Sequence, residues 1–450
     1  MFTLSAGLLV LPLFLCAELP SFNNDWLTVQ KGQFYLGKEP FFPIGSNIWT
    51  REDWEAEFRK KMEMGVNVFR GWMGWLDLPE SRETRRREME FGKIVQMAEK
   101  HRVFLLVSLF DGCSYNNVFG QTTLFQEGQT VFNMSQGGPC NQPRDILIHP
   151  ESIEMMKARI RKIVDLWGNS PAILGWDLMN ELDMVPNSQD EQAAWVKEIS
   201  EYLRWYELQK FGRHHLRTVS SYQPEPRADF FYNSPILDFA STHMYHGSVI
   251  DPKDTIRGAV DAGVSVRHII QRLSDNRPYL DTENGPILHL VDPCALAPPP
   301  ERVAKAYNNL AWAEIAAGAS GPGFLVSRRL VSVGAYEAMP AFAALWLRKS
   351  GPVRPLEMVV SGAVGFGSRR GEAAIFWIIK EEKQRFSEES VELSVSGLEN
   401  DEYEIIFYSD SKPEWLGSTR IHGPSFSLKM IPFRESVAGA ICPISVNEKK

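Results

Sequence analysis

The sequence has few cysteines, few histidines and no excess of positive charge. Its 450 residues include 5 cysteines and 9 histidines, and its formal net charge is −8. Histidine and cysteine do not recur at the spacing of a zinc site, and neither a phosphate-binding loop nor a dinucleotide-binding glycine motif is present. A net negative charge disfavours a nucleic-acid partner. We therefore expect no metal, no cofactor and no nucleic acid.

Long apolar segments are rare as well, and the clearest one lies at the N-terminus. Residues 1–17 contain an apolar run that is too short for a stable membrane anchor and that ends in small residues near Ala17. This pattern is typical of a signal peptide, although the usual Lys or Arg at its start is missing. An uncleaved anchor and a buried terminus are the alternatives. We predict a secreted protein with no stable membrane anchor after processing.

Removal of this leader would leave four cysteines: Cys113, Cys140, Cys294 and Cys442. Four cysteines allow three pairings, which the sequence alone does not distinguish. Because Cys113 and Cys140 lie in one irregular segment, we predict a disulfide between them. Buried free thiols are the alternative.

Between residues 18 and 350, apolar strand patterns alternate with amphipathic helical patterns. A hairpin is expected first, at residues 26–36. Strands are then expected at residues 41–46, 66–70, 103–110, 172–180, 216–221, 237–243, 278–283 and 318–326. Parallel strands separated by helices, about eight in about 300 residues, indicate a (β/α)8 TIM barrel. A doubly wound open sheet is the alternative, because the number of strands does not prove closure.

The pattern changes after Gly351 and Pro352. Short alternating strands, separated by turns, are expected at residues 373–379, 390–395, 403–408 and 425–430. We predict a small antiparallel β-sandwich domain at residues 351–450, which follows the barrel domain at residues 18–350.

Polar residues stand at the ends of several predicted strands. The segment PAILGWDLMNELD, at residues 171–183, runs from apolar residues into Asn180 and Glu181, and the seventh strand ends at Glu283. In a (β/α)8 barrel, catalytic groups sit at the carboxyl ends of the strands. Two carboxylates facing each other there are what cleavage of a glycosidic bond requires. A structural ion pair, for example between Arg70 and Glu283, would explain the same pattern.

Several motifs together resemble the glycoside hydrolases of clan A, and in particular family 5, the cellulase and β-mannanase family. The resemblance spans residues 26–350, and the Asn-Glu pair on the fourth strand with the Glu on the seventh is its specific part. The motifs are FPIGSN at residues 42–47, NVFR at 67–70, GWDLMNE at 175–181, THMY at 242–245 and PYLDTE at 278–283.

The resemblance implies that Glu181 is the acid/base and Glu283 the nucleophile of a retaining glycosidase. Arg70 and Tyr245 would hold Glu283 as an anion, which lowers its pKa relative to that of Glu181. Other roles stay open for the two supporting residues. Arg70 would serve equally as a buried structural cation, and Tyr245 as a plain aromatic wall.

Asn180 and His243 are implied to contact the sugar. Asn180 would hydrogen-bond the 2-hydroxyl group, and His243 would line the subsite beside the scissile bond. The alternatives are a turn-forming residue for Asn180 and a hydrogen-bonded core histidine for His243.

The sequence departs from the family pattern at two strands. The third strand ends in SLFDG, at residues 108–112, without the histidine that is common there, and the eighth lacks the tryptophan that stacks on the sugar. Phe324 is a candidate replacement for that tryptophan. Trp72 and Trp75, after the second strand, are further candidates for stacking on sugar rings, with loop packing as the alternative.

We therefore expect a monomeric glycoside hydrolase that cleaves oligo- or polysaccharides of the β-mannan or β-glucan type by a two-glutamate double displacement. A barrel that binds carbohydrate without cleaving it and a transglycosylase with the same residues are the alternatives. The short join near Gly351 predicts that the C-terminal domain stabilises the barrel. Polysaccharide binding is the alternative role for that domain.

Overall fold

The structure is a computed structural model. It describes residues 25–48, 54–116, 122–251, 253–288, 295–326, 333–339, 352–380, 391–400, 402–410, 412 and 414–444. The predicted leader at residues 1–17 and Cys294 lie outside the described residues.

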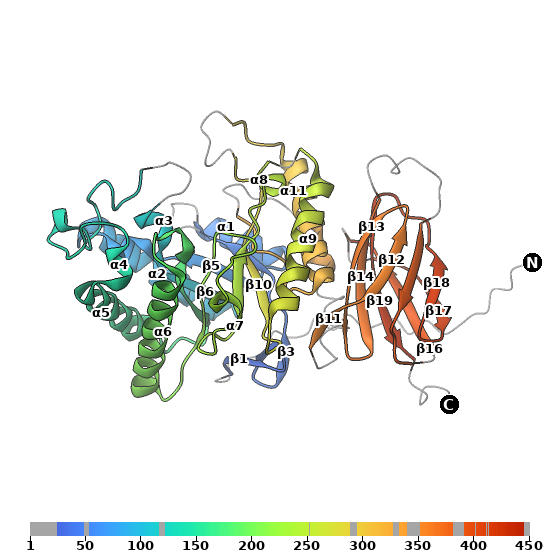
Figure 1. The fold of residues 1–450 in the computed structure, drawn as a ribbon, viewed down its shortest axis with the longest axis horizontal. Coiled ribbons are helices and arrows are strands. Elements are labelled where there is room, and N and C mark those ends of the chain that lie inside the picture. The colour runs from blue at the N-terminus through green and yellow to red at the C-terminus, as the bar shows by residue number, and fades with distance from the viewer. Residues whose placement is uncertain are drawn as a thin grey trace, which may run out of the picture.

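Parallel strands occupy the centre of the N-terminal part of the chain (Figure 1). One sheet has the order β4 (Gly45–Asn47), β5 (Val68–Trp72), β6 (Phe104–Asp111), β7 (Ile173–Asn180) and β8 (Leu216–Thr218), and a second pairs β9 (Ala240–His243) with β10 (Tyr279–Glu283). A backbone hydrogen bond from Asp238 N to Arg217 O joins β8 to the start of β9. Bridges from Leu325 to Ser46 and to Asn284 close the ring. The predicted (β/α)8 barrel is confirmed.

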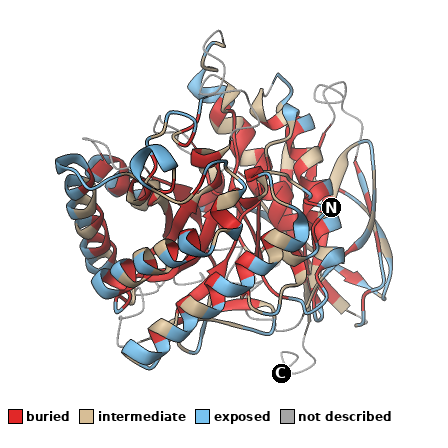
Figure 2. Cartoon of the chain, turned by 60° about the vertical axis from the view of Figure 1, so that its left-hand side comes forward, coloured by how far each residue is buried: buried red, intermediate tan, exposed pale blue. Residues whose placement is uncertain are grey.

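Helices surround these strands, and their inner faces are buried while their outer faces are exposed (Figure 2). The longer ones are α1 (Trp54–Glu63), α2 (Arg82–His101), α5 (Pro150–Trp167), α6 (Gln189–Phe211), α9 (Thr255–Arg272) and α11 (Pro300–Ala317). Their ends follow from the sequence. For example, α6 begins after Ser188, which forms a capping box with Glu191, and it ends at Gly212 with a φ of 68°.

Short helical turns lie in the loops between these elements. They are η1 (Gly74–Asp77), α3 (Gly112–Tyr115), η2 (Met134–Gln136), α4 (Asp145–Ile148), η3 (Leu182–Met184), α7 (Phe230–Asn233) and α8 (Gly247–Ile250). Among the residues that the structure describes, no helix combines the length and the apolar character needed to cross a bilayer.

The N-terminal hairpin packs against the interior of the barrel. It is part of a small antiparallel sheet of β1 (Leu27–Gln30), β2 (Gln33–Leu36) and β3 (Glu39–Phe41). Its apolar residues Leu27, Phe34 and Leu36 form one buried cluster with residues of the barrel strands, among them Leu106 and Leu280. The polar side chains lie at the other end of the barrel, where the strands finish.

The C-terminal part consists of two antiparallel sheets. The larger has the order β11 (Val353–Pro355), β13 (Val364–Arg370), β14 (Ala373–Ile379), β19 (Ser436–Pro443), β16 (Glu402–Tyr408) and β17 (Trp415–His422). The smaller has the order β12 (Glu357–Ser361), β15 (Glu392–Ser396) and β18 (Phe426–Lys429). A buried apolar cluster joins the two sheets, as in the predicted sandwich.

The larger sheet also packs on the barrel helices α9 and α11, which lie beside it in Figure 1. Phe366 of β13 and Trp377 of β14 belong to the same buried cluster as the barrel core. Polar contacts join the two parts as well: Ser368 Oγ donates to Ala316 O at 2.6 Å, and Trp312 Nε1 donates to Asp410 O at 2.5 Å. The contact between the two parts is thus both apolar and hydrogen-bonded.

Candidate active site

The predicted polar residues meet at the carboxyl ends of the barrel strands. Asn180 ends β7, His243 ends β9, and Glu283 ends β10 in register with His243. Glu181 follows Asn180 in the left-handed region, with φ 51° and ψ 52°. This conformation is uncommon for a residue with a side chain, and such residues cluster at functional sites.

The two glutamates face each other across His243. Nδ1 of His243 lies 2.7 Å from Oε1 of Glu181, and Nε2 lies 3.8 Å from Oε1 of Glu283. One oxygen of each carboxylate and one ring nitrogen of His243 all lie within 4.8 Å of one another. The glutamates are 5% and 7% exposed, and His243 is completely buried. Water is therefore largely excluded around two carboxyl groups that stand close together.

Both oxygens of Glu283 have hydrogen-bond donors. Nη1 of Arg70 bonds Oε1, and the hydroxyl of Tyr245 donates to Oε2 at 3.0 Å. The Arg70 guanidinium is completely buried, and its Nη2 donates to Asp177 Oδ2 at 2.6 Å and to Asn180 Oδ1 at 2.7 Å. This arrangement gives Glu283 a fixed cation on one side and a neutral donor on the other.

Burial is the largest effect on the pKa of both glutamates. Burial raises the pKa of Glu181 to about 7. Burial also raises the pKa of Glu283, whereas His243 and Arg70 oppose this effect, and Arg70 likewise lowers the pKa of Glu181. Because burial lowers the pKa of His243 to about 4, this imidazole is neutral near pH 7. Arg70 is therefore the cation that faces the glutamates at neutral pH, and of the two glutamates it is hydrogen-bonded to Glu283.

Cys113 does not form the predicted disulfide. Cys113 and Cys140 are both free thiols, so that prediction is wrong. The two side chains point into different surroundings: Sγ of Cys113 lies 2.7 Å from Oε2 of Glu181, whereas Cys140 is buried in the apolar core beside Phe132. The two cysteines lie in the same loop, as expected, but the turns of this loop keep their side chains apart.

The predicted aromatic residues do not all reach the site. Trp72, at the end of β5, is half-buried, and its ring centroid lies 5.1 Å from Cζ of Arg70. Trp75 packs in the barrel core and is only 5% exposed. Phe324 is completely buried in the cluster with Phe34 of the N-terminal hairpin. Phe324 and Trp75 are therefore core residues, which corrects their prediction as sugar platforms, and Trp72 is the candidate that remains.

Two buried aspartates support the site and were missed from the sequence. Asp177 binds Arg70 from within β7. Asp281, two residues before Glu283, accepts hydrogen bonds at 3.2 Å from the backbone nitrogens of Glu283 and Met244. The signal for both was available, because an aspartate inside a buried strand needs a partner.

Glu181, His243 and Glu283 are also the only group of His, Cys, Asp and Glu in the described ranges that is close enough to hold a metal ion. Two contacts disfavour that use. The Arg70 guanidinium is bonded to Glu283, and Nδ1 of His243 already bonds Glu181. A divalent cation would have to share this space with a permanent positive charge.

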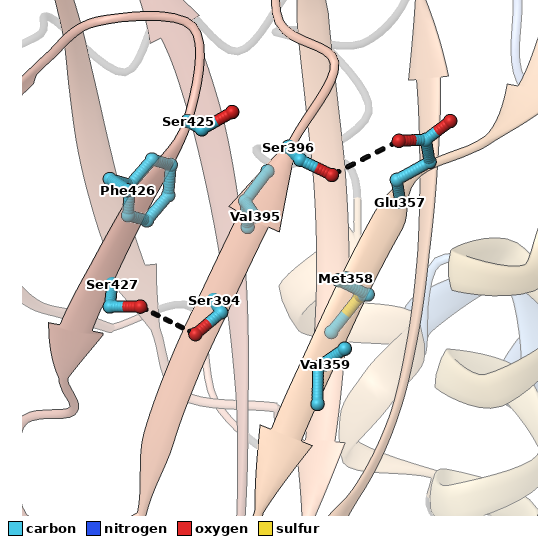
Figure 3. A pocket seen from close by; sticks show the side chains of 9 residues that line it. All are labelled: Glu357, Met358, Val359, Ser394, Val395, Ser396, Ser425, Phe426 and Ser427. Carbon is cyan, nitrogen blue, oxygen red and sulfur yellow. Dashed lines mark hydrogen bonds between the residues drawn. The ribbon is translucent and has the colours of Figure 1, made fainter.

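A hollow lies on the smaller C-terminal sheet (Figure 3). Its polar groups bond one another, with Ser394 and Ser427 hydroxyls 2.6 Å apart and Ser396 Oγ 3.0 Å from Glu357. Phe426, the aromatic residue of its lining, packs against the sandwich core. The hollow therefore offers a sugar few free hydrogen bonds, and the barrel carries the stronger candidate site.

Known structures agree with this architecture. No protein-family model matches the sequence, and no curated protein matches it either. A solved glycoside hydrolase superposes with a TM-score of 0.60 at 14% sequence identity, over 94% of this chain and 98% of its own. A family 5 glycoside hydrolase from Bacteroides vulgatus gives a TM-score of 0.57 at 13% identity, over 94% of this chain and 95% of its own. The fold is that of family 5 glycoside hydrolases. At this identity the likeness concerns the fold, and the chemistry rests on the site residues.

Proposed function

We propose that this protein is a retaining glycoside hydrolase that cleaves β-linked glycans of the β-mannan or β-glucan type. The observation that carries the proposal is the spacing of the glutamates, since one oxygen of Glu181 lies within 4.8 Å of one oxygen of Glu283. Retaining pairs stand roughly 5–5.5 Å apart, whereas inverting pairs stand roughly 6.5–9.5 Å apart to admit a water molecule. The spacing fits direct attack by one carboxylate.

The hydrogen bonds support a division of roles. Glu283, held by Arg70 and Tyr245, attacks the anomeric carbon as an anion. Glu181, whose pKa burial raises to about 7, gives its proton to the leaving oxygen as the glycosidic bond breaks. The Glu181 carboxylate then takes a proton from water, whose oxygen displaces Glu283 from the anomeric carbon.

Asn180 and His243 complete the site in this proposal. The Asn180 amide donates one N–H to Asp111 Oδ1 at 2.8 Å and lies 3.7 Å from Cys113 Sγ. Its second N–H is therefore weakly engaged and is available to the sugar 2-hydroxyl. Nε2 of His243 is buried and has no hydrogen-bond partner, so a substrate hydroxyl would satisfy it.

The test is a hydrolysis screen with the full-length protein on β-mannans, β-glucans and aryl β-glycosides. We expect new reducing ends, with a product that first appears as the β-anomer in proton NMR. Glu181→Gln should abolish cleavage of the polysaccharide, and the exposed Glu301→Gln, on α11, should leave it unchanged. Retardation in a glycan gel without cleavage would show a binding protein instead, and chain lengthening would show a transglycosylase.

A further inference from the structure

The thiol of Cys113 contacts the glutamate that we propose as the acid/base. Its Sγ lies 2.7 Å from Oε2 of Glu181, while Nδ1 of His243 lies 2.7 Å from Oε1. Each oxygen of this carboxyl group therefore has one partner. We infer that Cys113 is a positioning residue: its thiol accepts a hydrogen bond from the protonated Glu181 carboxyl and donates one to the carboxylate left after proton transfer. The inference rests on the proposed function.

The local backbone is built to bring this thiol to Glu181. Asp111 caps the short helix α3, and its Oδ1 accepts from Cys113 N at 3.2 Å and from Asn180 Nδ2 at 2.8 Å. Gly112 allows the close approach, because a Cβ there would lie 2.3 Å from Glu181 O. The sequence Asp111-Gly112-Cys113 thus docks the end of β6 onto the end of β7.

The chemistry of a thiol suits a residue that must release a proton and later take one up. Sulfur is a weak acceptor, so it does not hold the Glu181 proton against the leaving oxygen. The S–H group is also a donor, and it can turn to the carboxylate once that proton has left. Burial and the negative charges of Glu181 and Asp111 raise the pKa of Cys113 well above its ordinary value. The thiol therefore keeps its own proton throughout the cycle.

Other charged and titratable groups also act on Glu181. They are Arg70 of β5, Asp111 of β6, Asp177 of β7, Asp183 of η3, His243 of β9 and Glu283 of β10. Burial is the largest effect and raises the pKa of Glu181, while the Cys113 contact lowers it. Removing the thiol should therefore raise the pKa of the acid/base and leave the other groups in place.

The experiment compares Cys113→Ala and Cys113→Ser with Cys442→Ser, a change at a cysteine in β19 of the C-terminal domain. For Cys113→Ala we expect the alkaline limb of the pH profile of kcat/KM to move to higher pH, by roughly half a pH unit to one pH unit. Hydrolysis of an aryl glycoside with a poor leaving group should fall by about tenfold, whereas a dinitrophenyl glycoside, which needs no proton, should be cleaved within about twofold of the wild-type rate. Cys113→Ser, which keeps a donor and an acceptor, should restore the position of the alkaline limb, and Cys442→Ser should not move it.

The outcomes separate this inference from the proposed function. If the wild-type protein cleaves glycosides with retention but Cys113→Ala keeps the wild-type alkaline limb and leaving-group dependence, the inference fails alone. If the wild-type protein cleaves no glycoside, the proposed function fails.

A second measurement does not require a folded Cys113 variant. Iodoacetamide should alkylate Cys113 several-fold faster in Glu181→Gln than in wild type at about pH 8, because a neutral neighbour favours the reactive thiolate. Cys442 should react with iodoacetamide at the same rate in wild type and in Glu181→Gln. Equal alkylation rates of Cys113 in both proteins would contradict the inference.

Discussion

Arg70 and Asp177 form an ion pair with no exposed surface, in which Nη2 lies 2.6 Å from Oδ2. The same guanidinium bonds the carboxylate of Glu283. Asp177 therefore fixes the cation that keeps the proposed nucleophile charged. Removal of one partner from a buried ion pair is strongly destabilising, so this pair links the stability of the barrel to its chemistry.

Asp177→Asn should lower the free energy of unfolding by about 3–5 kcal/mol and reduce kcat as well, because Arg70 loses its fixed partner. Urea denaturation and steady-state kinetics measure the two effects. Asp165→Asn is the matched control, since Asp165 is 44% exposed and pairs with Lys210 at the surface. Asp165→Asn should lower the free energy of unfolding by less than about 1 kcal/mol. Equal costs for the two variants would contradict the assigned role of Asp177.

The pH dependence of hydrolysis should follow the two glutamates. Glu181 has a pKa of about 7, so kcat/KM for a glycoside with a poor leaving group should fall above this pH by about tenfold per unit. The acid limb should lie above the ordinary glutamate range, because burial raises the pKa of Glu283. A dinitrophenyl glycoside should lose the alkaline limb. An alkaline limb of equal steepness for both substrates would argue against Glu181 as the acid.

A buried acid pair should make stability depend on pH. Glu314 of α11 is hydrogen-bonded to Asp281, and burial raises its pKa from 4.5 to about 7. Between these values the folded state holds more protons than the unfolded state, so the free energy of unfolding falls as the pH rises. Glu314→Gln should reduce this fall between about pH 5 and about pH 8 by on the order of 1–3 kcal/mol. Glu301→Gln, exposed on the same helix, should leave the slope unchanged, and an unaltered slope in Glu314→Gln would refute the prediction.

The contact between the barrel and the larger C-terminal sheet should make the two parts unfold together. Phe366 is 4% exposed, lies against α9 at Gly263, and has Arg267 Cζ 5.5 Å from its ring centroid. Phe366→Ala should lower the free energy of unfolding by about 3–5 kcal/mol. It should also shift a single unfolding transition in which both domains unfold together. Val359→Ala, at a site 70% exposed on the smaller sheet, should change stability by less than about 0.5 kcal/mol. Loss of the sandwich with an unchanged barrel transition would show that the domains are independent.

The barrel and the position of its two glutamates at one edge could be predicted from the sequence because the information there is local, whereas their catalytic roles were implied by the resemblance to family 5 glycoside hydrolases. Each buried strand is an apolar run, and the polar residue that ends it lies at the same edge of the barrel as the others. Asn180, Glu181 and Glu283 follow this rule, and the structure brings them together.

The errors arise where side-chain direction depends on distant parts of the chain. Cys113 and Cys140 share a loop, but only the docking of Gly112 against Glu181 O decides where the Cys113 thiol points. Phe324 lies in a segment that joins the barrel through isolated bridges at Leu325. Strand periodicity could not tell its inward position from a place beside the sugar.

The central claim is that Glu283 forms a covalent bond to the sugar while Glu181 supplies the proton. The most direct measurement is trapping with an activated fluoro-glycoside of the sugar that the screen identifies, followed by peptide mass mapping. We predict one glycosyl group on Glu283, in wild type and in Glu181→Ala, with no label in Glu283→Ala. Label on another carboxylate, or an unlabelled wild-type enzyme whose product has inverted configuration, would contradict the account.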